Sequence, residues 1–210
     1  MDITSNIRIL TAKLVVLGFV CLALLGAHRA LSGDLSMPET PQSPANKYFT
    51  DVMLVTHKGE SLQLYTDLIK DKVVIIHSFF TSCKSSCPVS MRQMAGIQQR
   101  FSDNMGKELF ILSISLDPAI DSPLKLQAYA DELNAGPGWQ LMSGSQGNVD
   151  LVLKKLGLYV ADIESHKNTM IIGNESTGLW KKAFLLAPPE ALDELISIVL
   201  NDEAPVAVLD

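Results

Sequence analysis

The spacing of hydrophobic positions changes period in the middle of the chain, and each change predicts an element. Residues 72–80, KVVIIHSFF, and residues 109–117, LFILSISLD, are nearly continuous apolar runs rich in β-branched side chains. Such runs are typical of strands that are covered on both faces, as in a parallel sheet. Between them, after Pro88, apolar residues recur at the spacing of a helix. The pattern therefore predicts a strand, a helix and a second strand.

The rest of the chain continues this alternation and closes with a hairpin and a helix. A first hairpin over 49–65, with its turn at 57–60, is expected before the first apolar run. After the second run we expect helices over 123–133, 148–156 and 189–200 and strands over 139–142, 168–173 and 179–186. Alternating strands and helices favour an α/β sandwich around one central sheet. In such folds ligands bind at the carboxyl ends of the strands.

The N-terminal part has a different pattern, which predicts a membrane segment. Residues 14–27 carry no charge, and Arg8 and Lys13 precede them. This arrangement suits a signal-peptide core or, if residues 9–12 extend it, a membrane anchor, and we expect an uncleaved anchor. The chain then divides into an anchor at 1–31, a flexible Pro-containing linker at 32–47 and a folded domain at 48–210.

Composition and charge narrow the classes of partner. Hydrophobic residues make up 47% of the chain, which is ample for a buried core, and the formal net charge is −6. Along the sequence the basic residues gather only in two doublets, Lys154–Lys155 and Lys181–Lys182. An acidic chain without a basic patch does not attract nucleic acid or anionic lipid. We therefore expect no nucleic-acid partner.

The clearest chemical motif is a pair of cysteines, Cys83 and Cys87, with Pro88 directly after the second. The pair follows the first apolar run, so it lies at the carboxyl end of a predicted strand. A disulfide staple across so short a loop gains little loop-closure entropy, which leaves a redox pair or a metal site. If a helix begins at residues 84–85, both sulfurs share one face, and the helix N-terminus lowers the thiol pKa. Two thiolates favour a soft ion such as Cu(I).

Among the histidines and methionines, the sequence pattern alone identifies no further metal ligand. His28 lies at the membrane boundary, and His57 lies in a predicted turn, where solvent exposure is expected. We expect His77, inside an apolar strand, to be packed or locally hydrogen-bonded, and His166 reads as an ordinary residue of a polar loop. Core packing is expected for Met91, Met94 and Met170 because of their helical or strand placement.

Three segments together resemble the SCO/SenC family. They are residues 80–88, FTSCKSSCP; residues 113–123, SISLDPAIDSP; and His166 ahead of a strand and hairpin. The resemblance covers about 48–200 and implies a membrane-tethered protein with a thioredoxin-like fold, built on a central mixed sheet, that matures the copper site of cytochrome c oxidase. It implies that Cys83, Cys87 and His166 are ligands of a copper ion and that Asp121 lies near them. From the residues alone, Asp121 also suits the N-cap of the helix that starts at Pro123.

Two departures from the family pattern keep other functions open. Ser165 stands where the family often has an acidic residue, and Lys84 and Lys167 add positive charge that opposes a bound cation. The first hypothesis is copper delivery to a cytochrome c oxidase copper-site subunit or to another copper or thiol acceptor. The second is a thiol–disulfide reductase in which Cys83 attacks and Cys87 resolves, and the third is a copper or redox sensor. The expected location is a single-pass inner membrane protein, with the C-terminal domain in the periplasm or intermembrane space.

Overall fold

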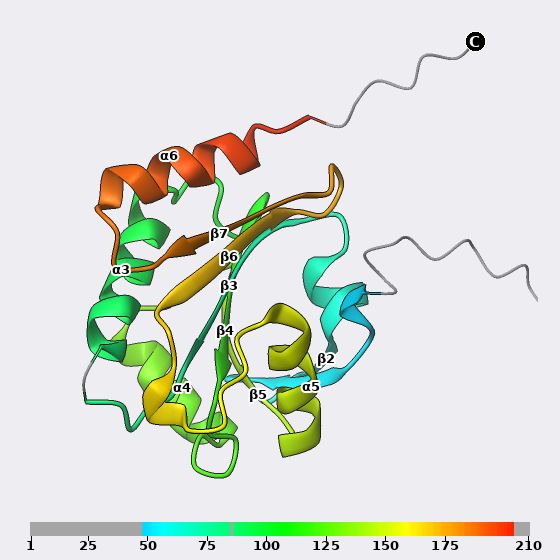
Figure 1. The fold of residues 1–210 in the computed structure, drawn as a ribbon, viewed down its shortest axis with the longest axis vertical. Coiled ribbons are helices and arrows are strands. Elements are labelled where there is room, and N and C mark those ends of the chain that lie inside the picture. The colour runs from blue at the N-terminus through cyan, green and yellow to red at the C-terminus, as the bar shows by residue number, and fades with distance from the viewer. Residues whose placement is uncertain (1–47, 85, 204–210) are drawn as a thin grey trace, which may run out of the picture. The chain divides into compact units, whose positions relative to one another are not determined.

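A computed structural model describes residues 48–84 and 86–203. These residues form one mixed sheet of seven strands with helices on both faces (Figure 1). The strands are β1 (Met53–Thr56), β2 (Ser61–Gln63), β3 (Val73–Phe79), β4 (Leu109–Ser115), β5 (Trp139–Ser143), β6 (Thr169–Asn174) and β7 (Leu179–Phe184). The predicted α/β sandwich with a central mixed sheet is therefore confirmed.

The chain divides after Pro41, and the part from Gln42 onward is a compact unit by itself. The described residues of this unit contain the whole sheet and its core, so it can be produced as a separate domain. The predicted anchor at 1–31 and the linker at 32–47 lie outside the described residues. Within 48–84 and 86–203, no helix combines the length and apolarity needed to cross a membrane.

The strand order is β2-β1-β5-β4-β3-β6-β7, and it determines which strand ends lie side by side. Strands β3, β4 and β5 are parallel neighbours, whereas β6 pairs antiparallel with β3. In this register Phe79, the last residue of β3, pairs with Ser115, the last residue of β4. Because β6 runs in the opposite direction, the chain that enters it at Thr169 lies at the same edge of the sheet. The functional side chains described below come from this edge.

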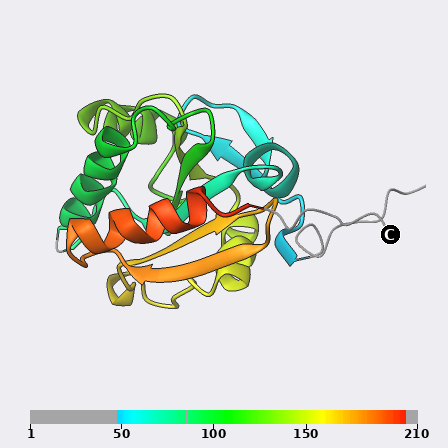
Figure 2. The same ribbon diagram turned by 90° about the horizontal axis from the view of Figure 1, so that it is seen from above.

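The helices divide between the two faces of the sheet. They are α3 (Cys87–Arg100), α4 (Pro123–Glu132), α5 (Gln146–Leu156) and α6 (Pro189–Leu200). Helices α3, α4 and α6 cover one face and α5 covers the other (Figures 1 and 2), as right-handed crossovers between β3, β4 and β5 require for α3 and α4.

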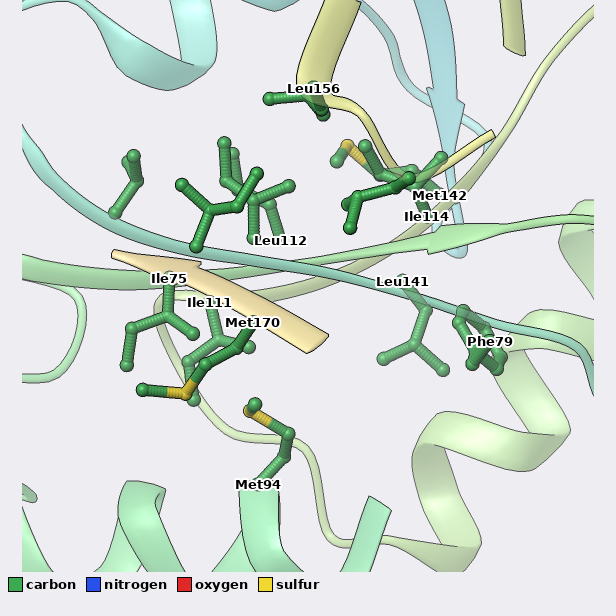
Figure 3. Packing of buried hydrophobic residues seen from close by; sticks show 14 of the residues in the cluster. Ile75, Phe79, Met94, Ile111, Leu112, Ile114, Leu141, Met142, Leu156 and Met170 are labelled. Atoms are coloured by element: carbon green, nitrogen blue, oxygen red, sulfur yellow. The ribbon is translucent and has the colours of Figure 1, made fainter. Parts of the chain in front are cut away.

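Alternating side chains of the central strands fill both sides of the core. In Figure 3, Ile111 lies on the side of the sheet from which Met94 of α3 approaches. The next residue, Leu112, lies on the opposite side with Leu156 of α5. Both faces of β3 and β4 are therefore buried, which is why their sequences are continuously apolar.

Local signals in the sequence set several element boundaries. Helix α4 begins with Pro123 in its first turn, and the Ser122 hydroxyl accepts a hydrogen bond from the Lys125 amide at 3.4 Å. Helix α5 ends at Leu156, and its C-cap, Gly157, has a φ of 65°, the left-handed conformation that glycine adopts without steric cost.

One predicted element is wrong. The strand expected to reach residue 65 stops at Gln63, and residues Leu64–Ile69 form η1, a π-helix. Its buried side chains are Leu64, Tyr65, Leu68 and Ile69. This spacing places apolar side chains on one face of a helix, whereas a strand would alternate them.

The buried histidines show where pattern reasoning was right and where it was wrong. His77 is 1% exposed, and its Nε2 lies 2.6 Å from Ser113 Oγ, so the predicted packed and hydrogen-bonded histidine is confirmed. His57 is only 5% exposed and accepts a hydrogen bond from the Leu141 amide through Nδ1 at 3.3 Å. The predicted solvation of His57 is wrong because its turn packs against β5. The core placement of the three methionines, Met91, Met94 and Met170, is confirmed.

Candidate metal centre

Cys83 and Cys87 lie at the junction between β3 and α3. The Cys83 amide donates to the Phe80 carbonyl at 3.3 Å, which closes a turn directly after the strand. Helix α3 begins only at Cys87, with Ser86 as its N-cap, so the predicted start at 84–85 is two to three residues early. The Cys87 amide instead donates to Cys83 Sγ at 3.4 Å. One sulfur therefore receives an amide of the first helical turn, and the other belongs to that turn.

His166 reaches the same place from a distant part of the chain. It follows η2 (Ile163–Ser165), a short 3₁₀ helix that Asp162 caps, and it precedes β6. His166 Nδ1 lies 2.9 Å from the Ile163 carbonyl oxygen, and Nε2 lies 3.2 Å from Cys87 Sγ. Because a carbonyl only accepts, Nδ1 carries the proton and the Nε2 lone pair faces the sulfur. The backbone thus fixes the tautomer that can bind a metal.

Side chains of the core fix the position of this imidazole. The Phe80 ring meets the His166 ring edge to face, with centroids 5.4 Å apart. On the far side of the loop, the Ser90 hydroxyl of α3 donates to Asn168 Oδ1 at 2.7 Å. Only 9% of His166 is exposed. The sequence reading of His166 as an ordinary loop residue is therefore wrong.

Together these side chains form a three-donor cluster. The sulfurs of Cys83 and Cys87 and a ring nitrogen of His166 all lie within 4.8 Å of one another. Both sulfurs are buried, and no disulfide joins the two cysteines. The structure thus brings together the three residues that the resemblance groups as ligands. A set of two thiols and one imidazole suits a soft ion such as Cu(I), and the three donors are close enough together for one ion to contact all of them.

The electrostatics of Cys87 differ from the expectation for a helix N-terminus. Burial raises the pKa of the Cys87 thiol to about 12, and the hydrogen bond to Cys83 adds to this shift. The nearby Glu164 carboxylate acts in the same direction. Burial therefore outweighs the helix end, and the predicted lowering of the pKa is wrong for Cys87. The metal-free thiol stays protonated at neutral pH, and binding a metal ion releases that proton.

The buried carboxylate of Asp121 holds the turn before Cys83 in place by hydrogen bonds. Its side chain is 0% exposed, and it accepts hydrogen bonds from the Ser115 hydroxyl at 2.6 Å and from the Thr81 amide at 3.1 Å. The Thr81 hydroxyl also binds this carboxylate, and Lys125 Nζ lies 3.5 Å from it. Ser122, and not Asp121, caps α4, so the N-cap interpretation of Asp121 is wrong. Its carboxylate instead fixes Thr81, two residues before Cys83.

Sequence reasoning missed Thr81 and Ser115 as parts of this site. Their signal is positional, because Ser115 ends β4, Thr81 follows the end of β3, and these two strand ends are paired. Polar residues that follow adjacent parallel strands meet at one edge. The two lysines that depart from the family pattern, Lys84 and Lys167, are both exposed, so solvent screens their charge.

Comparison with known proteins agrees with this geometry. The model of the SCO1/SenC family matches residues 40–196. The SCO2-like protein of Rickettsia conorii is 24% identical over 168 residues, which cover 78% of this chain and 78% of that protein.

Solved structures show the same fold. Yeast Sco1 with copper bound superposes with a TM-score of 0.60 at 21% identity, over 72% of this chain and 92% of that chain. BsSco, described as a member of the Sco family of cytochrome c oxidase assembly proteins with a disulfide switch, superposes with a TM-score of 0.59 at 20% identity, over 72% of this chain and 92% of that chain. The thioredoxin-like fold of the Sco proteins is therefore shared. The family model matches well over half of this chain, and the chain therefore belongs to the SCO1/SenC family.

Proposed function

We propose that this protein binds copper as cargo through Cys83, Cys87 and His166 and delivers it to the copper site of cytochrome c oxidase. The observation that carries the proposal is the convergence of two sulfurs and one imidazole nitrogen within 4.8 Å. Similarity to yeast Sco1 with copper bound and to BsSco, from a family of cytochrome c oxidase assembly proteins, supports the cargo and the acceptor.

The chemistry of the three donors suits transfer as well as binding. Two sulfurs and one nitrogen leave the coordination of a copper ion open to an incoming ligand, so an acceptor thiol can replace the donors one at a time. The site lies at the sheet edge, where Cys83 is 7% exposed and Cys87 is 1% exposed. We therefore expect the acceptor to approach from the side of Cys83.

A histidine substitution tests the copper site. His166→Ala removes the nitrogen donor, and we expect it to weaken copper binding by well over tenfold while disulfide exchange with a small thiol stays largely intact. The measurement is competition against a chromophoric Cu(I) chelator, with His57→Gln as the matched histidine control because His57 lies outside the donor cluster. If His166→Ala binds copper as tightly as the parent, the three-donor site is rejected.

A second candidate function is thiol–disulfide exchange, which the unequal burial of the two thiols favours. Cys83 as a thiolate would attack one sulfur of an acceptor disulfide, and the other acceptor sulfur would leave as a thiolate. Cys87 would then attack Cys83 Sγ and release the second acceptor sulfur. The acceptor gains two electrons and the cysteine pair becomes a disulfide, so turnover needs a dithiol reductant.

Two measurements on the metal-free protein test this second function. Because burial raises the pKa of Cys87 to about 12, iodoacetamide at pH 8 should modify Cys83 well before Cys87. Mass spectrometry of the peptides reports the order, and faster modification of Cys87 would contradict it. A reduction potential far below that of the compartment would leave the disulfide hard to reduce, so turnover would need a dedicated donor, whereas a potential above that of the acceptor disulfide would argue against a reductase.

For the location, we propose a single-pass anchor in the inner membrane that holds the domain in the periplasm or intermembrane space. The uncharged run at 14–27 after Arg8 and Lys13 supports this. Carbonate extraction of membranes tests the anchor, and protease digestion of intact and permeabilised compartments tests the side. Release of the full-length chain by carbonate would reject the anchor.

A further inference from the structure

A hollow of about 510 Å³ lies on the face of the sheet that α5 covers. Phe49, Leu156, Ile171 and Trp180 form its apolar lining. Trp180 lies directly over Gly173, where a Cβ atom would come within 2.0 Å of the indole, and the Phe49 ring packs against it with centroids 4.8 Å apart. The hollow is thus a preformed aromatic cavity of the size that binds part of a small molecule or lipid.

The fold surrounds this hollow with lysines that are far apart in the sequence. Lys181 and Lys182 of β7 line it, and Lys182 Nζ donates to the Leu156 carbonyl at the end of α5 at 3.1 Å. From the other doublet, Lys155 Nζ donates to the carbonyl of Tyr48, another lining residue, at 2.7 Å. None of the described residues that line the hollow is acidic. The prediction from the sequence that the chain has no basic patch is therefore wrong, because the fold brings lysines of both doublets to one hollow.

Exposed aromatic rings accompany these lysines. Tyr48 is 53% exposed and Tyr159 is 40% exposed, and the ammonium of Lys154 lies 4.4 Å from the centroid of the Tyr159 ring. Tyrosine and tryptophan next to lysine are enriched where proteins meet the headgroup region of a bilayer. Lysines near such a surface are attracted to anionic lipid headgroups. The chemistry of the hollow thus matches an acyl or glycerol portion in the aromatic cavity and a phosphate beside the lysines.

The proposed membrane anchor would hold the hollow near a membrane. The described domain begins at Tyr48, which lines the hollow, and 47 residues precede it. If residues 1–31 form the expected anchor, the expected linker at 32–47 separates it from Tyr48, and a flexible linker of that length spans roughly 22 Å on average. A weak lipid site would therefore be held at high local concentration.

We infer that this aromatic and basic hollow binds the headgroup of an anionic phospholipid and docks the domain on the membrane. The docking would also orient the metal centre. Gly173, under the hollow, pairs with Val74 near the start of β3, whereas the cysteines follow the end of β3. The hollow also includes Ile171, which pairs with Ile76 in the middle of β3, so it extends from the start to the middle of that strand, and its Gly173 end lies roughly 20 Å from the cysteines by the rise of the strand. Docking would present the metal centre away from the lipid surface. The inference does not depend on the proposed copper function.

The test uses residues 42–210, the compact unit that contains the whole sheet. The probe is vesicles of phosphatidylglycerol and phosphatidylcholine in equal amounts, and co-sedimentation of the unmodified domain measures binding. A Trp139→Phe variant leaves Trp180 as the only tryptophan, so its emission reports on the hollow itself. We expect co-sedimentation that falls with added salt and a blue shift of Trp180 emission on binding.

Charge variants separate the hollow from general electrostatics. Lys182→Glu should weaken vesicle binding at least fivefold, since Lys182 shares the face of β7 with Trp180 and each lysine at an anionic surface contributes about that factor. Lys107→Glu, with the same change of net charge at an exposed position outside the hollow, should stay within twofold of the parent. Lys182→Gln gives a milder second variant, and unchanged thermal unfolding shows that each variant is folded.

Several outcomes would overturn the inference. They are the absence of binding to anionic vesicles, equal binding to vesicles of phosphatidylcholine alone, equal losses for Lys107→Glu and Lys182→Glu, and an unchanged Trp180 emission on vesicle binding. A shift of Trp180 emission with inorganic phosphate alone would identify a free-anion site and would also reject the lipid. Copper affinity in the Lys182 variants should be unchanged, so failure here is distinguishable from failure of the proposed function.

Discussion

Removing the charge of Asp121 should destabilise the domain and loosen the cysteine turn. In Asp121→Asn the side chain keeps its shape, but a site that is 0% exposed loses its negative charge. The Thr81 amide and the Ser115 hydroxyl both donate to Oδ2, so the Asn carbonyl can take that position, and its NH₂ group then faces the Thr81 hydroxyl, which can rotate and accept. Every donor keeps an acceptor, but charge-assisted hydrogen bonds become weaker neutral ones, which costs about 1–3 kcal/mol.

Truncation should cost more because it removes every acceptor. Asp121→Ala leaves the Thr81 amide and the Ser115 hydroxyl without the carboxylate and opens a cavity, so we expect a loss of about 3–5 kcal/mol. The ion pair contributes little of this, since the Lys125 side chain is 42% exposed and solvent screens it. Lys125→Met should therefore cost less than about 1 kcal/mol.

Urea unfolding of the metal-free domain measures all three variants. The order Asp121→Ala, Asp121→Asn, Lys125→Met from most to least destabilised is the expected result. Copper affinity is the second measurement, because Thr81 lies two residues before Cys83 and a looser turn spreads the sulfur positions. A free energy of unfolding for Asp121→Asn within 0.5 kcal/mol of the parent would refute the reasoning.

Three further predictions concern groups outside the donor cluster. Burial lowers the pKa of His77 to about 4 in the folded state, so between about pH 6.5 and 4 the unfolded chain binds a proton that the folded chain excludes, and the free energy of unfolding falls with falling pH by up to roughly 3 kcal/mol. Urea unfolding at several pH values should show that His77→Gln lacks this loss. An equal fall of the unfolding free energy with pH in that variant would contradict the prediction. Gly138→Ala should destabilise by several kcal/mol, since its Cβ would lie 2.3 Å from the Gly106 amide nitrogen at a φ of +84°, whereas Gly147→Ala, with nothing within 4 Å, should be neutral or stabilising in thermal unfolding. Burial raises the pKa of Tyr129 to about 12, so Tyr129→Phe should remove a phenol that ionises near pH 12 in an absorbance titration, and an unchanged titration in that range would be inconsistent with that burial.

The sequence predicts the central strands well because a strand that is buried on both faces has a continuous run of apolar residues. The runs at 72–80 and 109–117 become β3 and β4 within two residues, and Pro189–Leu200 is the predicted last helix. Where one segment packs on another, the pattern carries less information. Nothing local distinguishes His57, buried under β5, from a solvated turn residue.

The candidate site could be predicted only in part for the same reason. The spacing of Cys83 and Cys87 identifies a thiol site, and their place after an apolar strand locates it. His166 was grouped with them by family resemblance, since its burial depends on the antiparallel pairing of β6 with β3. The pKa of Cys87 could not be predicted from its place at a helix N-terminus, because burial by other segments raises it.

Cys87 and His166 are 79 positions apart in the chain, and only the pairing of β6 with β3 brings them together. A polypeptide still emerging during synthesis presents its thiols long before the imidazole exists. If copper binds as proposed, such an immature chain would hold the ion by two donors at most and would yield it readily to other thiols. Binding by all three donors would then require a folded domain, so the proposed site would discriminate completed domains from unfinished ones.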